Sequence, residues 1–196
     1  KKPEKFHLGG QQYLSSLPND LLCGTAEGYS QINYRGSPIV CLGRSSLFEG
    51  RYAYYLINET GECYIWGHPS DRFGPKSFNK FIPEPLKLET NGISLQAAAL
   101  GHNHALFLDK SGKVYGSGLN FDGQIDADTS KSYDFKLLDL PEKVKYITAF
   151  GASSFAVTET GELWVAGSNL HGQLGIGGHT DSVSEFTKVL MDKPIE

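Results

Sequence analysis

The chain has 196 residues, of which 39% are hydrophobic and 23 are glycines, and its formal net charge is −4. This length fits one ordinary domain or two, and the hydrophobic fraction suffices for a packed core. The acidic balance argues against the broad basic face that phosphate backbones require, so we expect no direct nucleic-acid partner. No apolar run approaches the roughly 18 residues that span a membrane, so we expect no membrane partner either.

The cysteines Cys23, Cys41 and Cys63 are isolated from one another, since no CxxC pair occurs. A zinc site or a redox motif is therefore not expected. Isolated cysteines fit a reducing compartment, where they serve as small buried apolar groups; a reactive thiol is the less favoured alternative. We expect a cytoplasmic or nuclear protein.

Residues 1–20 form a polar N-terminal segment, and the remainder of the chain repeats itself. One set of turn glycines recurs at intervals of 51 and 49 residues, as Gly61, Gly112 and Gly161. A second set keeps the same intervals, as Gly67, Gly118 and Gly167. We divide residues 21–196 into a partial repeat at 21–49 and repeats at 50–100, 101–150 and 151–196. Such a period indicates an array of supersecondary units, which typically functions by presenting a binding surface.

Each repeat reads as a set of short strands. In the last copy, alternating apolar residues predict strands near 146–150, 154–158 and 163–166, and a weaker strand follows near 186–189. Residues 159–161 have the composition of a hairpin turn. Four strands in about fifty residues, repeated, predict an all-β protein with four-stranded β-propeller blades. We expect Ala97–Ala99 and Ala149 at the crowded axis, and Trp66, Tyr115 and Trp164 as core between blades.

The most distinctive segment is a loop at 118–125 that matches 167–174 position by position. Its glycines supply positive φ, its asparagine can bond its own backbone, and its glutamine can satisfy loop amides and carbonyls. We therefore assign a structural turn role to Gly61, Gly67, Gly112, Gly118, Asn120, Gly123, Gln124, Gly161, Gly167, Asn169, Gly172 and Gln173. A phosphate-binding loop is not expected, because neither a following Lys-Ser/Thr nor a helix start is present.

These residues resemble the regulator of chromosome condensation repeats. The segment Gly-His-Asn-His-Ala-Leu at 101–106 resembles the first strand of that pattern, and residues 161–175 resemble its turn, second strand and Asn-x-x-Gly-Gln-Leu-Gly loop. The family's histidine occurs here only as His104, and we place its equivalents at Ala53 and Ser154. The copy at 50–74 lacks the Asn-x-x-Gly-Gln loop.

The resemblance implies a seven-bladed propeller of roughly twice this length, whereas about three and a half repeats are present here. The next repeat glycine would fall near position 202, beyond Glu196. We therefore expect a partial propeller of about three to four blades. The remainder would come from the same chain or from another chain.

The resemblance also implies a non-enzymatic protein that regulates a small GTPase as a guanine-nucleotide exchange factor. Exchange needs no covalent chemistry, because the factor only has to bind the nucleotide-free GTPase more tightly. We expect the partner at strand entries that carry His102, Asn103, His104, Ser153 and Ser154. For His104 the alternative is a hydrogen-bonded residue in the central channel.

The alternative function is a scaffold or targeting propeller without exchange activity. Residues 122–142 carry six acids against two lysines, so Asp122, Asp126 and Asp128 are candidates for contact with a basic partner, unless the run is merely a solvated loop. An enzyme is not expected, because no nucleophile–base pair or carboxylate pair recurs at a useful spacing. We expect neither a cofactor nor a metal site.

Overall fold

The computed structural model of the chain describes residues 34–45, 53–69, 81–178 and 180–196 in full, together with the backbone of the strands at 4–8, 12–17, 20–25 and 28–32. Within these residues every regular element is a β-strand. They form four antiparallel sheets of four strands, each in simple chain order.

The first sheet is β1 (Glu4–Leu8), β2 (Gln12–Leu17), β3 (Asp20–Thr25) and β4 (Gly28–Ile32). The second is β5 (Ile39–Arg44), β6 (Ala53–Asn58), β7 (Cys63–Gly67) and β8 (Ile82–Lys87). The third is β9 (Leu95–Leu100), β10 (His104–Asp109), β11 (Val114–Leu119) and β12 (Ser132–Leu137). The fourth is β13 (Val144–Phe150), β14 (Ser153–Thr158), β15 (Leu163–Ser168) and β16 (Ser182–Lys188).

The predicted all-β blade architecture is confirmed, but the boundaries of the sheets differ from those of the sequence repeats. The repeats at 50–100 and 101–150 each begin with the second strand of one sheet and end with the first strand of the next, so β9 falls in the repeat at 50–100. The polar segment at 1–20 also contains β1 and β2. The repeats and the blades are therefore out of step by one strand.

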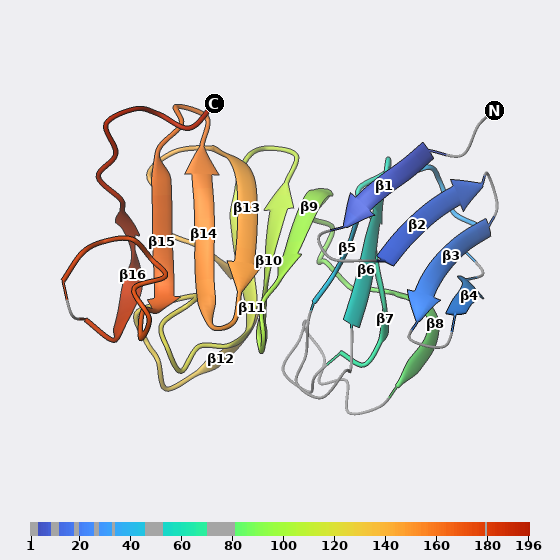
Figure 1. Cartoon of the computed structure of the whole chain (residues 1–196), viewed down its shortest axis with the longest axis horizontal. Helices are drawn as coiled ribbons and strands as arrows, with labels where there is room; N and C mark the ends of the chain where they lie inside the picture. The colour runs from blue at the N-terminus through green and yellow to red at the C-terminus, as the bar shows by residue number, and fades with distance from the viewer. Residues whose placement is uncertain are drawn as a thin grey trace.

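The second, third and fourth sheets lie side by side, with the third between the other two (Figure 1). Their first strands are neighbours, since β9 contacts both β5 and β13. The small side chains of Ala98 and Ala99, 6% and 9% exposed, lie on this shared inner strand, as predicted for the axis. The sheets thus fan outward from their first strands, as blades of a propeller do.

Two apolar clusters fill the space between the sheets. In the first, Tyr55 and Ile57 of β6 pack against Leu95 and Phe107 of the third sheet, and the buried Tyr55 hydroxyl donates a hydrogen bond to the backbone carbonyl of Ala98. The second cluster joins the third and fourth sheets, and its buried members are Ala99, Leu106, Leu108, Val114, Ile125, Leu138, Val144 and Ala156.

Strand β10 explains why the apolar run Ala105–Leu108 lacks an alternating pattern. Ala105 and Phe107 face the second sheet, while Leu106 and Leu108 face the fourth, and none of the four is more than 1% exposed. A strand that is covered on both faces reads as continuously hydrophobic.

The three aromatic residues predicted as core do not all occupy the same position in their blades. Tyr115 and Trp164 are equivalent, because both lie three residues before a glycine of the second set, but the equivalent in the second sheet is Tyr64. Trp66 lies two residues further along the same face as Tyr64, is 4% exposed and stacks on Tyr54 at 5.5 Å. Trp164 is only partly buried.

The eight turn glycines that we named all have positive φ, from 70° to 100°. At Gly167 the constraint is also steric, because a Cβ would lie 2.1 Å from the backbone oxygen of Ala152. Each glycine of the first set also accepts a backbone hydrogen bond from a residue 32 to 34 positions later. The pairs are Gly61 with Leu95, Gly112 with Val144 and Gly161 with Ile195. These bonds fasten each hairpin turn to the segment that follows the outer strand of its sheet.

We expect Phe107→Ala to destabilise the protein by about 3–5 kcal/mol, because it leaves a cavity between two sheets. Phe107 is 1% exposed and stacks on Phe135 at 4.8 Å. Denaturant unfolding of the two proteins measures the difference. The matched control is Leu137→Ala, at a residue that is 48% exposed, and a loss as large there would contradict this view of the core.

Candidate partner-binding surface

Four loops of the third and fourth sheets emerge at the same end of the blades. His104 pairs with Gly118 and Ser153 pairs with Gly167, so the start of each second strand lies beside the end of each third strand. The loops at 101–103, 120–131, 151–152 and 169–181 therefore gather there. We call this surface the loop end.

Asn120 organises the longer loop of the third sheet. Its side-chain oxygen accepts from the amides of Ile125 and Asp126, at 2.7 and 3.1 Å. Its side-chain nitrogen donates to the carbonyls of Asp126 and Asp128, at 2.7 and 2.9 Å. Asn120 is fully buried, and its side chain provides hydrogen bonds that regular secondary structure would otherwise provide to the loop backbone.

Asn169 repeats this arrangement in the fourth sheet with fewer bonds. Its oxygen accepts from the amide of Leu174 at 3.1 Å, and its nitrogen donates to the carbonyl of Thr180 at 2.9 Å. The glutamines act alike: the side-chain oxygen of Gln124 accepts from the amide of Asp122, and that of Gln173 accepts from the amide of His171. Both loops are therefore held from within by amide side chains.

A chain of hydrogen bonds links the third and fourth sheets beneath the loop end. The Ser154 hydroxyl donates to the backbone carbonyl of Gln124 at 2.7 Å, and Nε2 of His104 lies 2.9 Å from the same hydroxyl oxygen. Since the hydroxyl proton points at Gln124, Nε2 must carry the proton that His104 donates. Among the described atoms Nδ1 of His104 has no partner. Burial alone lowers the pKa of His104 to about 3, so the imidazole is neutral.

The structure therefore places three of the predicted contact residues inside the protein. His104, Ser153 and Ser154 are at most 1% exposed, and the Ser153 hydroxyl donates to the carbonyl of Ser168 at 2.8 Å. A direct contact with a partner, which we predicted for them, is not compatible with this burial. Strand register also shows that Ser153, rather than Ser154, is the equivalent of His104.

The other predicted contact residues are partly exposed. His102, Asn103 and Asp122 line the loop end, and the backbone amide of His102 donates to the carbonyl of Gly151 at 2.6 Å. Asp126 and Asp128 are also partly exposed but lie further along the longer loop of the third sheet. The structure thus brings some of the predicted residues together at the surface and keeps others inside.

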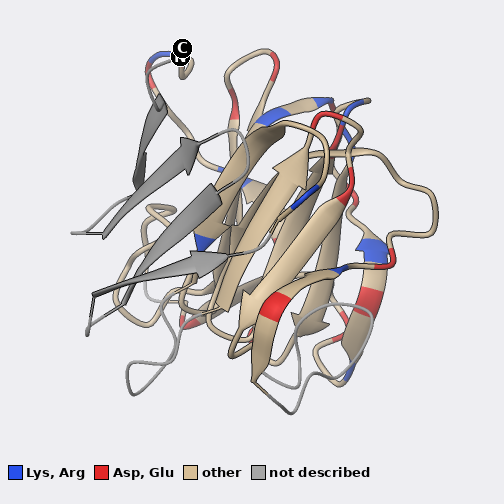
Figure 2. Cartoon of the chain, turned by 90° about the vertical axis from the view of Figure 1, so that its right-hand side faces the viewer, with Lys and Arg blue, Asp and Glu red and all other residues tan. Residues whose placement is uncertain are grey.

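Two carboxylates of the acidic stretch already have counter-ions. Asp126 pairs with Lys136 at 2.9 Å, and Asp128 pairs with Lys131. The pair with Lys131 and the bonds from Ser130 lower the pKa of Asp128 to about 2. Such surface pairs contribute little to stability, but they partly neutralise the stretch. Figure 2 shows acidic and basic residues interspersed over the described chain rather than gathered on one face.

Sequence reasoning missed three exposed apolar residues at the loop end. Phe121 and Leu170 occupy equivalent positions, directly after the buried asparagines, and they are 64% and 63% exposed. Phe150, at the end of β13, is 75% exposed. The signal was available in the sequence, because an apolar residue directly follows the asparagine in both loops. Exposed apolar side chains on a rigid loop are typical of a binding surface.

Potential metal ligands and thiols occur in the described residues. No group of three or more His, Cys, Asp or Glu residues in them could hold a metal ion. Cys41 is partly buried and Cys63 fully buried, both are free, and burial raises the pKa of the Cys63 thiol, which argues against its reactivity. Cys23 lies outside the described side chains. Among the described residues no helix has the length and apolar character needed to cross a bilayer.

Comparisons with known proteins agree with this geometry. The family profile described as Regulator of chromosome condensation (RCC1) repeat matches residues 96–124. The X-linked retinitis pigmentosa GTPase regulator of Homo sapiens is 32% identical over 157 residues, which cover 77% of this chain and 14% of that protein. The ultraviolet-B receptor UVR8 of Arabidopsis thaliana is 34% identical over 125 residues, which cover 61% of this chain and 28% of that protein.

A solved structure of Prp20p from Saccharomyces cerevisiae, a protein described with its binding to Gsp1p and histones, aligns with a TM-score of 0.73. The alignment has 13% identity and covers 98% of this chain and 52% of that one, so it shows the fold. Four-stranded blades whose inner strands lie side by side and whose loops are bounded by glycines are typical of a β-propeller. The chain belongs to the family of proteins that are built from regulator of chromosome condensation repeats. It spans well under a third of the two sequence relatives.

We expect the stability of the protein to fall as the pH drops from about 6.5 toward 3 because of His104. In that window the unfolded chain binds a proton at this residue, whereas the folded chain does not. The free energy of unfolding decreases by at most about 1.4 kcal/mol per pH unit for one such group. His104→Gln preserves a donor for Ser154 without titrating. Denaturant unfolding between pH 7 and pH 4.5 should give a shallower slope for the variant, and parallel curves would contradict a neutral buried imidazole.

We expect Asn120→Ala to cost more stability than Asn169→Ala, since Asn120 makes four side-chain hydrogen bonds to the backbone and Asn169 makes two. Each buried group left unpaired costs about 1–3 kcal/mol. Thermal or denaturant unfolding of both variants tests the order. Equal losses of stability, or a larger loss for Asn169→Ala, would show that these hydrogen bonds do not determine the stability of the loop.

Proposed function

We propose that the loop end binds a protein partner and that the partner is a small GTPase, whose nucleotide release the propeller accelerates. The observation that carries the proposal is the equivalent pair Phe121 and Leu170, which project from loops that Asn120 and Asn169 hold rigid. A pre-organised loop loses little conformational freedom on binding, so exposed apolar side chains on it contribute more of their burial to affinity.

Relatedness supports a GTPase as the partner. One sequence relative is described as a GTPase regulator, and a structural relative is described with its binding to Gsp1p. Exchange requires only that the propeller bind the nucleotide-free form more tightly than the loaded form, which shifts the population toward release. No reactive residue is needed, which agrees with the absence of a metal-ligand group among the described residues.

A scaffold or targeting propeller without exchange activity is the second candidate function. One observation favours it: every strand in the described part of the chain belongs to a four-stranded blade, with none left over to form an additional hairpin that could enter a GTPase. Both functions use the loop end as a binding surface. They differ only in whether the partner's nucleotide affinity changes. For either, we keep the cytoplasm or the nucleus as the proposed location.

We also propose that further propeller blades, from this chain or another, cover the outer face of the fourth sheet. Tyr146 lies on that face opposite Val157 and is 58% exposed, and Phe155 and Val157 are partly exposed. The corresponding residues of β10 are fully buried by the neighbouring sheet. Hydrogen exchange of the complete protein tests this, because rapid exchange of β13 and β14 would contradict coverage by another blade.

We expect the complete protein to accelerate the release of a labelled guanine nucleotide from at least one member of a panel of small GTPases. Phe121→Ala combined with Leu170→Ala should reduce the rate by about tenfold or more, since central apolar anchors of this kind contribute at least 1–2 kcal/mol. The control is Leu190→Ala, at a residue that is 93% exposed and lies outside the loop end.

The outcomes separate the proposals. A stable complex without acceleration favours the scaffold. An unchanged rate or affinity in the double variant would exclude the loop end as the contact surface. The absence of any bound protein would overturn the assignment of a binding function to this surface.

A further inference from the structure

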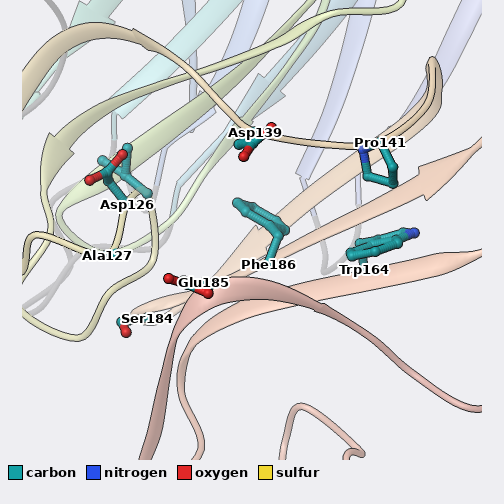
Figure 3. Close-up of a pocket in the computed structure, with 9 residues that line it drawn as sticks. Asp126, Ala127, Asp139, Pro141, Trp164, Ser184, Glu185 and Phe186 are labelled. Atoms are coloured by element: carbon teal, nitrogen blue, oxygen red, sulfur yellow. The ribbon is translucent and has the colours of Figure 1, made fainter.

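A groove lies between the third and fourth sheets (Figure 3). Its volume is about 410 Å³. One wall comes from the longer loop of the third sheet and from the link between β12 and β13, and the other comes from β15 and β16. The lining residues are Ile125, Asp126, Ala127, Asp139, Pro141, Trp164, Ser184, Glu185 and Phe186.

Beside the groove the fourth sheet differs from the third, because Ala156 stands at the position that Phe107 occupies in the third sheet. In the third sheet Phe107 is paired with Tyr115, and both rings contact Phe135, at 4.8 and 5.9 Å. In the fourth sheet the residue paired with Trp164 is Ala156, which supplies no ring. The Trp164 ring therefore has no aromatic ring at its paired position, unlike Tyr115 in the third sheet.

The indole of Trp164 is held in place and partly exposed. Its Nε1 donates to the carboxylate of Glu162 at 3.2 Å, and Glu162 in turn pairs with Lys188 at 2.5 Å. In Figure 3 the Trp164 ring lies beside Pro141 and Phe186, so the wall around it is apolar. An aromatic face that is fixed and accessible attracts a cation through its quadrupole.

Three of the remaining lining residues are acidic. Asp139 and Glu185 are exposed and have no ion pair or side-chain hydrogen bond among the described residues. Asp126 also lines the groove, but Lys136 and the Tyr133 hydroxyl already contact its carboxylate. The lining contains no lysine or arginine. The groove thus combines an aromatic wall with two carboxylates that lack a counter-ion.

We propose that this groove binds a basic segment of a protein partner, with one arginine or lysine side chain lying over Trp164 between the carboxylates of Asp139 and Glu185. Its volume lies within the roughly 300–1,000 Å³ of ligand sites, which suffices for a long side chain and its flanking backbone. The net charge of −4 favours approach of a cationic segment. This site is separate from the loop end and does not depend on GTPase binding.

The test uses the complete protein and the peptide acetyl-Gly-Arg-Gly-Arg-Gly-Arg-amide, with a citrulline version as the neutral comparison. The part of the emission change that is lost in Trp164→Phe reports Trp164, since Trp66 is 4% exposed in the second sheet. We expect a saturable change with the arginine peptide, at least about tenfold weaker binding of the citrulline peptide, and weaker binding at high salt. Trp164→Phe should abolish the signal.

The variant Asp139→Asn with Glu185→Gln should weaken peptide binding by at least about tenfold. The matched control, Glu84→Gln with Glu89→Gln, removes the same charge from exposed positions near the second sheet and should leave binding unchanged. Equal weakening in both variants would reduce the effect to general charge attraction and overturn the site. No saturable change, or equal binding of the citrulline peptide, would also overturn it, whatever the result with GTPases.

Discussion

The structure depends on one constraint: a central blade has two apolar faces, and both must be covered. Strand β10 shows it most clearly, because Ala105 and Phe107 are buried on one side and Leu106 and Leu108 on the other. Such a sheet cannot be stable alone, since exposing either face would return a large apolar area to water. The second and fourth sheets cover the two faces of the third sheet. As a result, the inner strands β5, β9 and β13 lie next to one another.

The buried polar residues beneath the loop end form hydrogen bonds within the protein and so hold the sheets and loops in place. Ser154 and His104 join two sheets through a shared hydrogen bond, and Asn120 satisfies four backbone groups of its loop. Buried polar groups must be paired, so the residue types that resemble binding residues are used internally. What is left for a partner is the apolar residue that follows each asparagine. A rigid polar frame that presents apolar tips is consistent with a protein-binding role.

Much of the fold could be predicted from the sequence, because turn glycines and the Asn-x-x-Gly-Gln loops recur at fixed intervals and have local causes. The strand that closes each blade could not be assigned, since a repeat in sequence does not reveal which neighbour its last strand pairs with. The burial of Ser153 and Ser154 was also inaccessible, because burial of short polar side chains is decided by contacts between sheets. The groove beside Trp164 is lined by residues from distant segments of two sheets, which no local pattern in the sequence brings together.

The one-strand offset between repeats and blades has a mechanical consequence. Strand β9, encoded at the end of one repeat, pairs with β10, encoded at the start of the next, through residues such as Leu100 and Ala105. Consecutive repeats are therefore joined by backbone hydrogen bonds as well as by side-chain packing. Pulling two of them apart requires a whole strand to be unzipped, so the array should resist tension better than a stack of self-contained modules joined by linkers.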